Sequence, residues 1–118
     1  MTKSDFLKRY NLTEAQFLGT EIIGGDLWLE GLTSIPIGFN PTVGGSLWLD
    51  SLTSIPDGFN PTVGRSLFLI RVKTIPVGFN PTVTGDLWFN SIKTIPVGFS
   101  PNVGGDLYVN GEIVKKTK

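Results

Sequence analysis

The sequence lacks two residue types on which much protein chemistry depends, cysteine and histidine. Without them the chain can form no disulfide, no zinc site of cysteine and histidine ligands, and no catalytic arrangement that needs a histidine base. A dominant charge is also lacking, because ten basic and ten acidic residues give a formal net charge of zero. A neutral chain has no overall field that would attract nucleic acid or an anionic membrane. We therefore expect no nucleic-acid or membrane partner, no cofactor and no metal site.

Long apolar runs are absent too. No stretch approaches the roughly 20 apolar residues that a helix needs to cross a bilayer. The first ten residues are rich in charge and do not resemble the apolar segment of a secretory signal peptide. Together these absences predict a cytoplasmic protein.

What the sequence does contain is a repeat of twenty residues. Residues 44–63 read GGSLWLDSLTSIPDGFNPTV, and similar units occupy 24–43, 64–83 and 84–103 with no insertion between them. A fifth copy begins at position 104 and then diverges. A constant period of this length is typical of a solenoid, in which each repeat forms one coil and stacks on the next. We therefore predict a single domain at 1–118, made of a cap (1–23), four repeats (24–103) and a partial fifth repeat with a hairpin cap (104–118).

Each repeat offers the same large apolar side chains to a shared core. In the second repeat they are Leu47, Leu49, Leu52, Ile55, Phe59 and Val63. Burying one such side chain stabilises a fold by roughly 1.5–3 kcal/mol, but a coil of twenty residues cannot enclose all of them by itself. The coils must therefore stack. The equivalent residues of every repeat, including Ile95 and Phe99 in the fourth, are expected in the core.

Two sequence patterns predict the conformation of each coil. Residues 26–30, DLWLE, alternate with period two, which indicates a strand whose leucines point inward and which pairs in parallel with its copy in the next coil. The rest of the coil contains two prolines five residues apart, which excludes a helix and predicts extended chain with tight turns. Glycine pairs such as Gly44-Gly45 would turn the chain into each strand through torsions that other residues avoid. We therefore expect a mainly β solenoid of low curvature, with one short strand per coil in a parallel sheet and a small α-helical N-terminal cap.

The first 23 residues contain signals for two short helices. Ser4 and Asp5 are suited to begin the first helix, and Thr13 with Gln16 forms a capping box that begins the second. Because the open end of a solenoid must be covered, we expect these helices to lie over the first coil. The apolar side chains that would cover it are Phe6, Tyr10, Leu12 and Phe17.

The C-terminal segment contains a hairpin signal. Asn110-Gly111 lies between alternating residues, a pattern typical of a two-residue turn between antiparallel strands. The fifth strand is therefore expected to turn back on itself instead of completing a coil. Lys115, Lys116 and Lys118 would then protect the outer sheet edge from pairing with another chain.

Residues 27–36, LWLEGLTSIP, follow the pattern Leu-x-Leu-x-x-Leu-Thr-x-Ile-Pro, which resembles the leucine-rich repeat. The closest resemblance is to its short form of about twenty residues, and similar repeats occur in bacterial and bacteriophage proteins. Two positions of the standard pattern are missing, including the one that holds the ladder asparagine. Asn40, Asn60 and Asn80 would form such a ladder elsewhere in the coil, with Ser100 interrupting it. The resemblance implies a leucine-rich-repeat-like solenoid, whereas the pattern alone also fits a right-handed β-helix.

The outward positions of the expected strands form three rows that cross the sheet. The central row is aromatic in every repeat, and we name it the aromatic strip: Trp28, Trp48, Phe68, Trp88 and Tyr108. One flanking row consists of Asp26, Ser46, Ser66, Asp86 and Asp106, and the other of Glu30, Asp50, Ile70, Asn90 and Asn110. Aromatic neighbours on one sheet face contribute about 0.2–1 kcal/mol per pair, so the strip has a purely structural interpretation. It is also more apolar surface than a monomer usually exposes, and tryptophan and tyrosine are enriched at binding hot spots.

Charge differs between the two halves of the repeat array. The first two repeats carry Glu30, Asp50 and Asp57, whereas the next two carry Arg65, Arg71, Lys73 and Lys93. The asymmetry is either ordinary solvated charge or a means to orient a partner protein or a second copy of the chain. The binding candidates are therefore the aromatic strip together with Glu30, Asp50, Ile70, Asn90 and Arg71.

Catalysis is not expected from these residues. Glu30 and Asp50 would lie one strand apart, near the ~5 Å of a retaining glycosidase pair, but an open sheet face offers no cleft that would differentiate the two carboxyl groups. Further oxygen ligands that would complete a calcium site do not converge on the pair. The sequence thus predicts a non-enzymatic module that binds another protein through the aromatic strip. Three alternatives stay open: carbohydrate binding by the aromatic rings, self-association, and a small inhibitor from a mobile element that occupies a host protein's surface.

Overall fold

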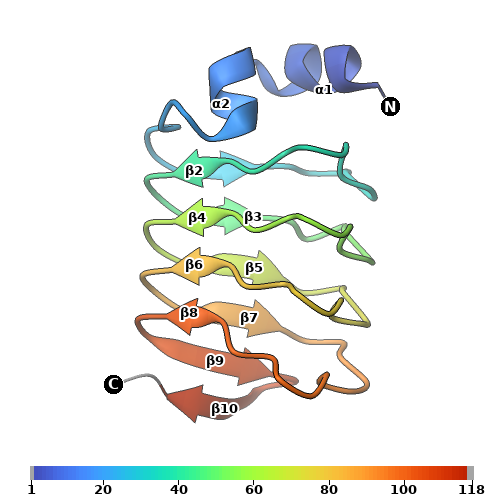
Figure 1. Cartoon of the computed structure of the whole chain (residues 1–118), viewed down its shortest axis with the longest axis vertical. Coiled ribbons are helices and arrows are strands. Elements are labelled where there is room, and N and C mark those ends of the chain that lie inside the picture. The colour runs from blue at the N-terminus through green and yellow to red at the C-terminus, as the bar shows by residue number, and fades with distance from the viewer. Residues whose placement is uncertain (1, 117–118) are drawn as a thin grey trace.

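The computed structural model describes residues 2–116 and shows a mainly β solenoid that carries two short helices at its N-terminal end (Figure 1). The fold class predicted from the repeat is therefore confirmed. The helices precede the first coil, and all the regular elements after them are strands. The two helices are α1 (Lys3–Tyr10) and α2 (Glu14–Leu18).

The strands form two sheets along the solenoid. The larger sheet has six strands: β1 (Leu27–Trp28), β3 (Leu47–Trp48), β5 (Leu67–Leu69), β7 (Leu87–Phe89), β9 (Asp106–Val109) and β10 (Glu112–Lys116). The smaller sheet has four: β2 (Thr42–Val43), β4 (Thr62–Val63), β6 (Thr82–Val83) and β8 (Asn102–Val103). All neighbours are parallel except β9 and β10, and the strands of each sheet follow one another in chain order.

Each parallel strand pairs with the strand one coil away at an offset of twenty residues. Leu47 pairs with Leu27 on one side and with Leu67 on the other, and Trp48 pairs with Phe68. This register places equivalent side chains above one another, so one repeated sequence generates continuous rows of side chains. Figure 1 shows the coils stacked in a nearly straight column, as expected for a solenoid of low curvature.

The sequence predicts one strand per coil, whereas the structure has two. In the smaller sheet the amide of Thr62 donates to the carbonyl of Pro41 (3.0 Å), and the amide of Gly64 donates to the carbonyl of Val43 (2.7 Å). Proline lacks an amide hydrogen but keeps its carbonyl acceptor, so a proline just before a strand does not prevent pairing. Threonine and valine are β-branched and favour extended backbone. The prolines correctly exclude a helix, but they obscure the short strands that follow them.

The glycine pairs at the coil corners are needed for a different reason than the expected one. Gly25 has a positive φ of 76°, but Gly45 does not belong to the residues with positive φ. A Cβ atom at Gly45 would lie 2.7 Å from the carbonyl oxygen of Gly25 in the preceding coil. A side chain at position 45 would therefore clash with the backbone of the preceding coil, whereas the third coil carries Arg65 at the equivalent position. The left-handed torsion occurs instead in the Pro-x-Gly turn, as at Gly58 with φ of 82°.

The interior is filled by the predicted apolar rows. Leu47, Leu49 and Leu52 are completely buried. One row of rings stacks along the axis with centroids 6.0, 6.3 and 6.4 Å apart: Phe39, Phe59, Phe79 and Phe99. The prediction is wrong for Ile95, which is 41% exposed, and Phe99 is only half-buried. Both lie in the fourth coil. The fifth copy turns back as a hairpin and forms no complete coil that would cover these two side chains.

The N-terminal helices begin close to the predicted positions. Helix α1 starts earlier than expected, because the hydroxyl of Thr2 rather than Ser4 or Asp5 caps it, accepting from the amide of Asp5 at 3.1 Å. The predicted capping box of α2 is present, with Thr13 and Gln16 each accepting the other's amide through a side-chain oxygen. Both helices are therefore specified by hydrogen bonds local to the sequence.

The apolar faces of the helices cover the first coil. Phe6 is fully buried, and its ring centroid lies 4.8 Å from that of Phe39. The ring of Phe17 packs against the same phenylalanine at 5.3 Å. Tyr10 and Leu12 are partly buried beside them, so all four residues expected to cover the coil do so.

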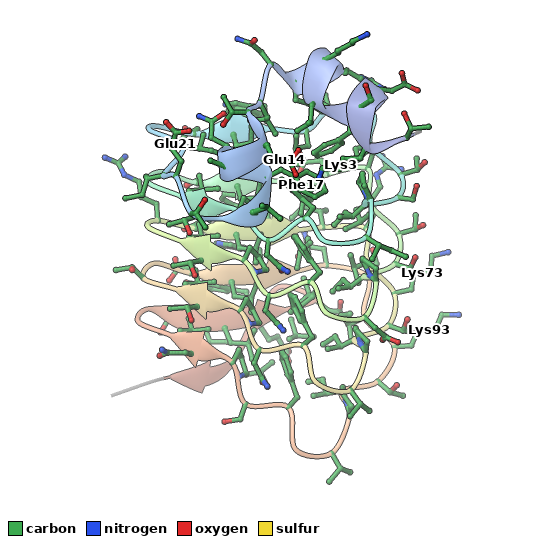
Figure 2. The ribbon with its side chains drawn as sticks, turned by 45° about the horizontal axis from the view of Figure 1, so that its top comes forward. Lys3, Glu14, Phe17, Glu21, Lys73 and Lys93 are labelled. Atoms are coloured by element: carbon green, nitrogen blue, oxygen red, sulfur yellow. The ribbon has the colours of Figure 1, made fainter. Side chains whose placement is uncertain are left out.

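Polar contacts hold the helices in place on the coil. The hydroxyl of Tyr10 and the guanidinium of Arg9 both donate to the carbonyl oxygen of Glu30, at 3.0 and 3.3 Å. Lys3 forms an ion pair with Glu14 that joins the two helices. Figure 2 shows this pair close to Phe17, at the helical end of the solenoid. The helices thus bond both to each other and to the first coil.

The predicted hairpin at the other end is present. Strands β9 and β10 are antiparallel, and the two residues between them have the positive φ angles of a primed turn, 54° at Asn110 and 87° at Gly111. Strand β10 therefore forms the outer edge of the larger sheet. Lys118 lies outside the described residues, as do the side chains of Lys115 and Lys116, so the expected edge protection stays a prediction.

An asparagine ladder runs along the coils, as the sequence predicts. The amide of Asn60 donates to Oδ1 of Asn40 at 2.6 Å, and the amide of Asn80 donates to Oδ1 of Asn60 at 2.7 Å. Each side chain therefore satisfies a backbone amide of the next coil. This ladder joins coils at a corner where neither sheet does.

Replacing Asn60 with alanine is expected to lower the free energy of unfolding by about 0.5–1.5 kcal/mol, because the amide of Asn80 loses its acceptor. Urea denaturation of the purified variant measures the change. Ser54→Ala, at an exposed position of the same coil, serves as the control and should stay within about 0.5 kcal/mol of the parent. Equal stability of the two variants would show that the ladder contributes nothing.

Candidate functional site

The aromatic strip forms one continuous stack across β1, β3, β5, β7 and β9. Consecutive ring centroids are 4.3, 3.9, 6.1 and 3.9 Å apart, and the planes of neighbouring rings differ by 3°, 12°, 19° and 6°. The register of the parallel sheet produces this arrangement, because it places residue 28 of one coil directly beside residue 48 of the next. The structure thus brings all five predicted aromatic residues together on one face.

Stacking decides which part of each ring faces the solvent. Nearly parallel planes at these separations place the ring faces against one another along the solenoid axis, so that ring edges point away from the sheet. Trp28, at the end of the stack, is 50% exposed. The rings inside the stack, those of Trp48, Phe68 and Trp88, are less exposed than Trp28. The strip therefore presents a row of apolar edges and a single largely open ring at its N-terminal end.

The indole nitrogen of Trp48 has no hydrogen-bond partner among residues 2–116, although it is buried. An unpaired buried donor costs free energy instead of contributing it. Trp48 therefore stabilises the fold through the contacts of its rings with Trp28 and Phe68, not through its polar atom.

The flanking row that begins at Asp26 is occupied in holding the coils together. Each side chain accepts a hydrogen bond from the amide twenty residues later: Asp26 from Ser46 (2.8 Å), Ser46 from Ser66 (3.2 Å), Ser66 from Asp86 (3.2 Å) and Asp86 from Asp106 (2.8 Å). Ser46 is also buried. Aspartate and serine can replace each other in this row without breaking it, because both offer an acceptor oxygen at the same place.

Tyr108 ends the strip in an acidic environment. Burial raises the pKa of its hydroxyl above the ordinary value, and the nearby carboxylates of Asp106 and Asp86 raise this pKa further. The hydroxyl therefore stays protonated at neutral pH and remains a hydrogen-bond donor at the edge of the strip.

The other flanking row supplies four of the predicted binding residues. Glu30, Asp50 and Asn90 are exposed, and Ile70 is half-buried. They lie in the turns that follow the strands of the larger sheet, so their side chains border the strip without entering the core. Arg71 is exposed in the same turn as Ile70. The structure thus places all ten candidates on or beside one face of the larger sheet.

Two other basic residues of the third and fourth coils, Lys73 and Lys93, lie away from the strip. Lys73 and Lys93 lie in the segments that come after the turns following β5 and β7. There the amide of Lys93 donates to the carbonyl of Lys73 at 3.2 Å. Figure 2 shows both lysines projecting from consecutive coils on the same side of the molecule. These two lysines therefore lie on another side of the solenoid than Arg65 and Arg71.

One residue of the exposed face was missed from the sequence. Ile113 of β10 pairs with Tyr108 and is 50% exposed, so it extends the strip by one apolar side chain. The signal was available, because a two-residue turn at 110–111 places residue 113 opposite residue 108. Asn110, the last residue of the flanking row, uses its side chain to hold the coil. Its Oδ1 accepts from the amide of Ile92 at 3.1 Å, and its Nδ2 donates to the carbonyl of Ile92 at 2.8 Å.

A second exposed apolar row lies at the tips of the Pro-x-Gly turns. Ile37 is 89% exposed, Val77 87% and Val97 fully exposed. Asp57 interrupts the row in the second coil. A cavity of about 50 Å³ lies beside the row between the third and fourth coils, next to Val77 and Val97. These side chains are separated and form no continuous stack comparable to the strip.

A larger hollow of about 360 Å³ lies at the glycine corner beside Asp26 and Arg65. Unpaired amides in glycine-rich turns can bind phosphate. Here, however, the amides of Gly44, Gly45 and Arg65 donate to carbonyl oxygens of the preceding coil at 2.8, 2.8 and 3.0 Å. These three amides are therefore not free to bind an anion.

Within residues 2–116 no group of three or more acidic side chains is placed to hold a metal ion. No helix in the same range is long and apolar enough to cross a membrane. Glu30 and Asp50 both lie exposed on the edge of the sheet face. No protein-family model matches the chain, and neither the curated proteins nor the solved structures provide a significant match.

Proposed function

We propose that the chain is a non-enzymatic protein-binding module of the cytoplasm whose partner contacts the aromatic strip. The observation that carries the proposal is the extent of the exposed apolar row, which crosses the whole larger sheet from Trp28 to Tyr108 and continues to Ile113. Apolar surface of this continuity is typical of contact surfaces in soluble proteins. Tryptophan and tyrosine also contribute strongly to binding, because they bury large areas at a low cost in side-chain entropy.

The proposal favours a protein over a carbohydrate as the ligand. A sugar ring packs its C–H groups against the face of an aromatic ring, where the electron density of the π system lies. In the strip the ring faces lie against one another, and Trp28 alone leaves much of its ring open. A protein surface, in contrast, can pack aliphatic side chains along a row of ring edges.

The repeat itself can be assigned to a type within this proposal. We take the coil as a variant of the short leucine-rich repeat in which Asn40, Asn60 and Asn80 supply the ladder that joins the coils. The bacteriophage resemblance of the repeats suggests the second candidate role, an inhibitor that covers a host protein's surface. Such an inhibitor would use the same strip, so the test below applies to both roles.

The proposal is tested with the variant Trp48→Ser/Phe68→Ser/Trp88→Ser. We expect the parent protein to retain a specific partner from cells in affinity purification, and the variant to lose the same partner by at least tenfold in mass-spectrometric abundance. The core residues beneath the strip are unchanged, so the circular dichroism of the variant should keep its β signature.

The matched control replaces three apolar side chains of the turn tips, Ile37→Ser, Val77→Ser and Val97→Ser. These residues are more exposed than the strip, so the control tests whether apolar surface in general retains the partner. The control should bind as the parent does. A partner that survives the strip variant, or that both variants lose equally, would overturn the proposal.

A further inference from the structure

The outward face of the larger sheet is acidic, although the chain as a whole is neutral. Its three rows contain no lysine or arginine, and they contain five carboxylates: Asp26, Glu30, Asp50, Asp86 and Asp106. Three basic side chains border these rows: Arg71 in the middle coil, Arg65 in the hollow beside Asp26, and Arg9, whose guanidinium donates to the carbonyl of Glu30 at 3.3 Å. The rows themselves thus carry only negative charge, and the positive charges nearest to them lie along their borders.

The carboxylates remain available to a partner. Glu30 and Asp50 are exposed. Asp26 and Asp86 each use Oδ1 to accept one amide of the next coil. An ionised carboxylate accepts several hydrogen bonds, so the second oxygen of each is left for a ligand. Besides burial, the carboxylates of Asp106 and Asp86 raise the pKa of Tyr108 at this end of the strip.

The spacing of the two acidic rows fits one secondary-structure element. The rows are four residues apart along each strand, which corresponds to at most ~13 Å in extended chain. An α-helix with its side chains is about 10–12 Å in diameter, so a helix that lies on the strip has carboxylates on both of its flanks. Five strands at about 4.8 Å spacing give the strip a length of ~19 Å, which corresponds to about 13 helical residues.

A second copy of the chain does not complement this face. In a face-to-face dimer whose two-fold axis is parallel to the strands, the order of the coils is reversed between the two copies. Asp26 of one copy would then meet Asp106 of the other, and Asp50 would meet Asn90. If the axis ran along the solenoid, Asp26 would meet Glu30. Both arrangements bring carboxylates together or opposite neutral groups, and like charges in contact disfavour association.

From the exposed strip, its acidic flanks and their separation we propose that the partner presents a basic amphipathic helix, whose apolar face lies on the ring edges and whose lysine or arginine residues reach the carboxylates on both sides. This inference rests on the proposed function and names the chemistry of its partner. Apolar contact supplies affinity, and the charges orient the helix and exclude acidic competitors.

The test uses three fluorescein-labelled peptides of 14 residues without tryptophan. The first has leucines on one helical face and lysines on the other, the second replaces the lysines with glutamates, and the third has the first composition in scrambled order. Binding to the intact protein is measured by anisotropy at low and high salt. All three tryptophans of the chain lie in the strip, so their emission reports directly on the contact.

We expect the leucine–lysine helix to bind at least tenfold more tightly than either other peptide, and to bind more weakly as salt rises. Glu30→Gln/Asp50→Asn should weaken it by roughly threefold to tenfold, since two exposed charge contacts are lost. The control is Asp57→Asn, an exposed carboxylate of the second coil at the tip of its turn, which should bind as the parent does.

The outcomes separate the inference from the proposed function. Loss of binding in Trp48→Ser/Phe68→Ser/Trp88→Ser, but not in Glu30→Gln/Asp50→Asn, would keep the strip as a docking face and overturn the basic partner. Equal binding of the glutamate helix, no binding of the lysine helix, or concentration-dependent dimers of the free protein in sedimentation would also overturn it. Binding that survives the triple serine variant would overturn the proposed function itself.

Discussion

Replacing Phe59 with alanine is expected to lower the free energy of unfolding by about 3–5 kcal/mol, the usual cost of removing a buried phenylalanine ring. Phe59 is 2% exposed, and its ring lies between those of Phe39 and Phe79 at 6.0 and 6.3 Å. Its loss opens a cavity that borders three coils, and the neighbouring rings cannot fill it because the sheets hold their coils in register. A domain of this size is stable by about 5–15 kcal/mol, so the change removes a large share of the total.

Urea denaturation followed by circular dichroism measures this effect. Because Phe59 lies in the second of four coils, the cavity weakens the contacts on both sides of that coil, and we expect hydrogen-exchange protection to fall throughout the solenoid. Val77→Ala, at an 87% exposed turn tip, is the control and should change stability by less than about 0.5 kcal/mol. A loss below about 1 kcal/mol for Phe59→Ala would contradict the tight stacking of the phenylalanine row.

Replacing Phe6 with alanine is the second change with a large expected effect. We expect it to lower the free energy of opening the N-terminal cap by about 3–5 kcal/mol. Phe6 is completely buried, and its ring contacts those of Tyr10, Phe17 and Phe39 with centroids 5.1, 5.9 and 4.8 Å away. Helix α1 has few other apolar anchors, so we expect the helices to detach from the first coil. In contrast to Phe59→Ala, the damage should be local, since the end of a repeat array can open without the rest.

Hydrogen exchange resolved by residue distinguishes the two cases. In Phe6→Ala the amides of α1, α2 and the first coil should lose protection, whereas those of β5, β7 and β9 should keep it. Leu18→Ala, which alters a 51% exposed side chain of α2, is the matched control and should leave protection unchanged. Uniform loss of protection along the whole chain would show that the cap and the coils unfold as one unit.

Several features of the fold follow from residues that act locally or at a fixed period. Thr13 and Gln16 specify the start of α2 because their hydrogen bonds close within four residues. Asn110-Gly111 specifies the hairpin because both residues tolerate positive φ. The row of Leu47 and its copies lies inside because a period of twenty residues repeats the same inward position in each coil.

Other features escaped prediction because they depend on what lies one coil away. The smaller sheet pairs Thr62 with Thr42, and neither residue has a strand signal strong enough to outweigh the prolines before it. A side chain at Gly45 would clash with the backbone of Gly25, which is twenty residues distant. Ile95 was expected in the core, and its exposure results from the path of the chain after residue 104.

Some features of the candidate site could likewise be predicted from the sequence, and others depend on the tertiary structure. The sequence by itself determined the repeat, the inward and outward rows and the composition of the aromatic strip, because a strand alternates its side chains and a constant period aligns them. Only the tertiary structure decided that the rings stack with their edges outward, that Asp26 and Asp86 also serve the backbone of the next coil, and that Ile113 lengthens the strip. Such properties depend on distances between residues that are remote in sequence, and stacking of the coils alone creates those distances.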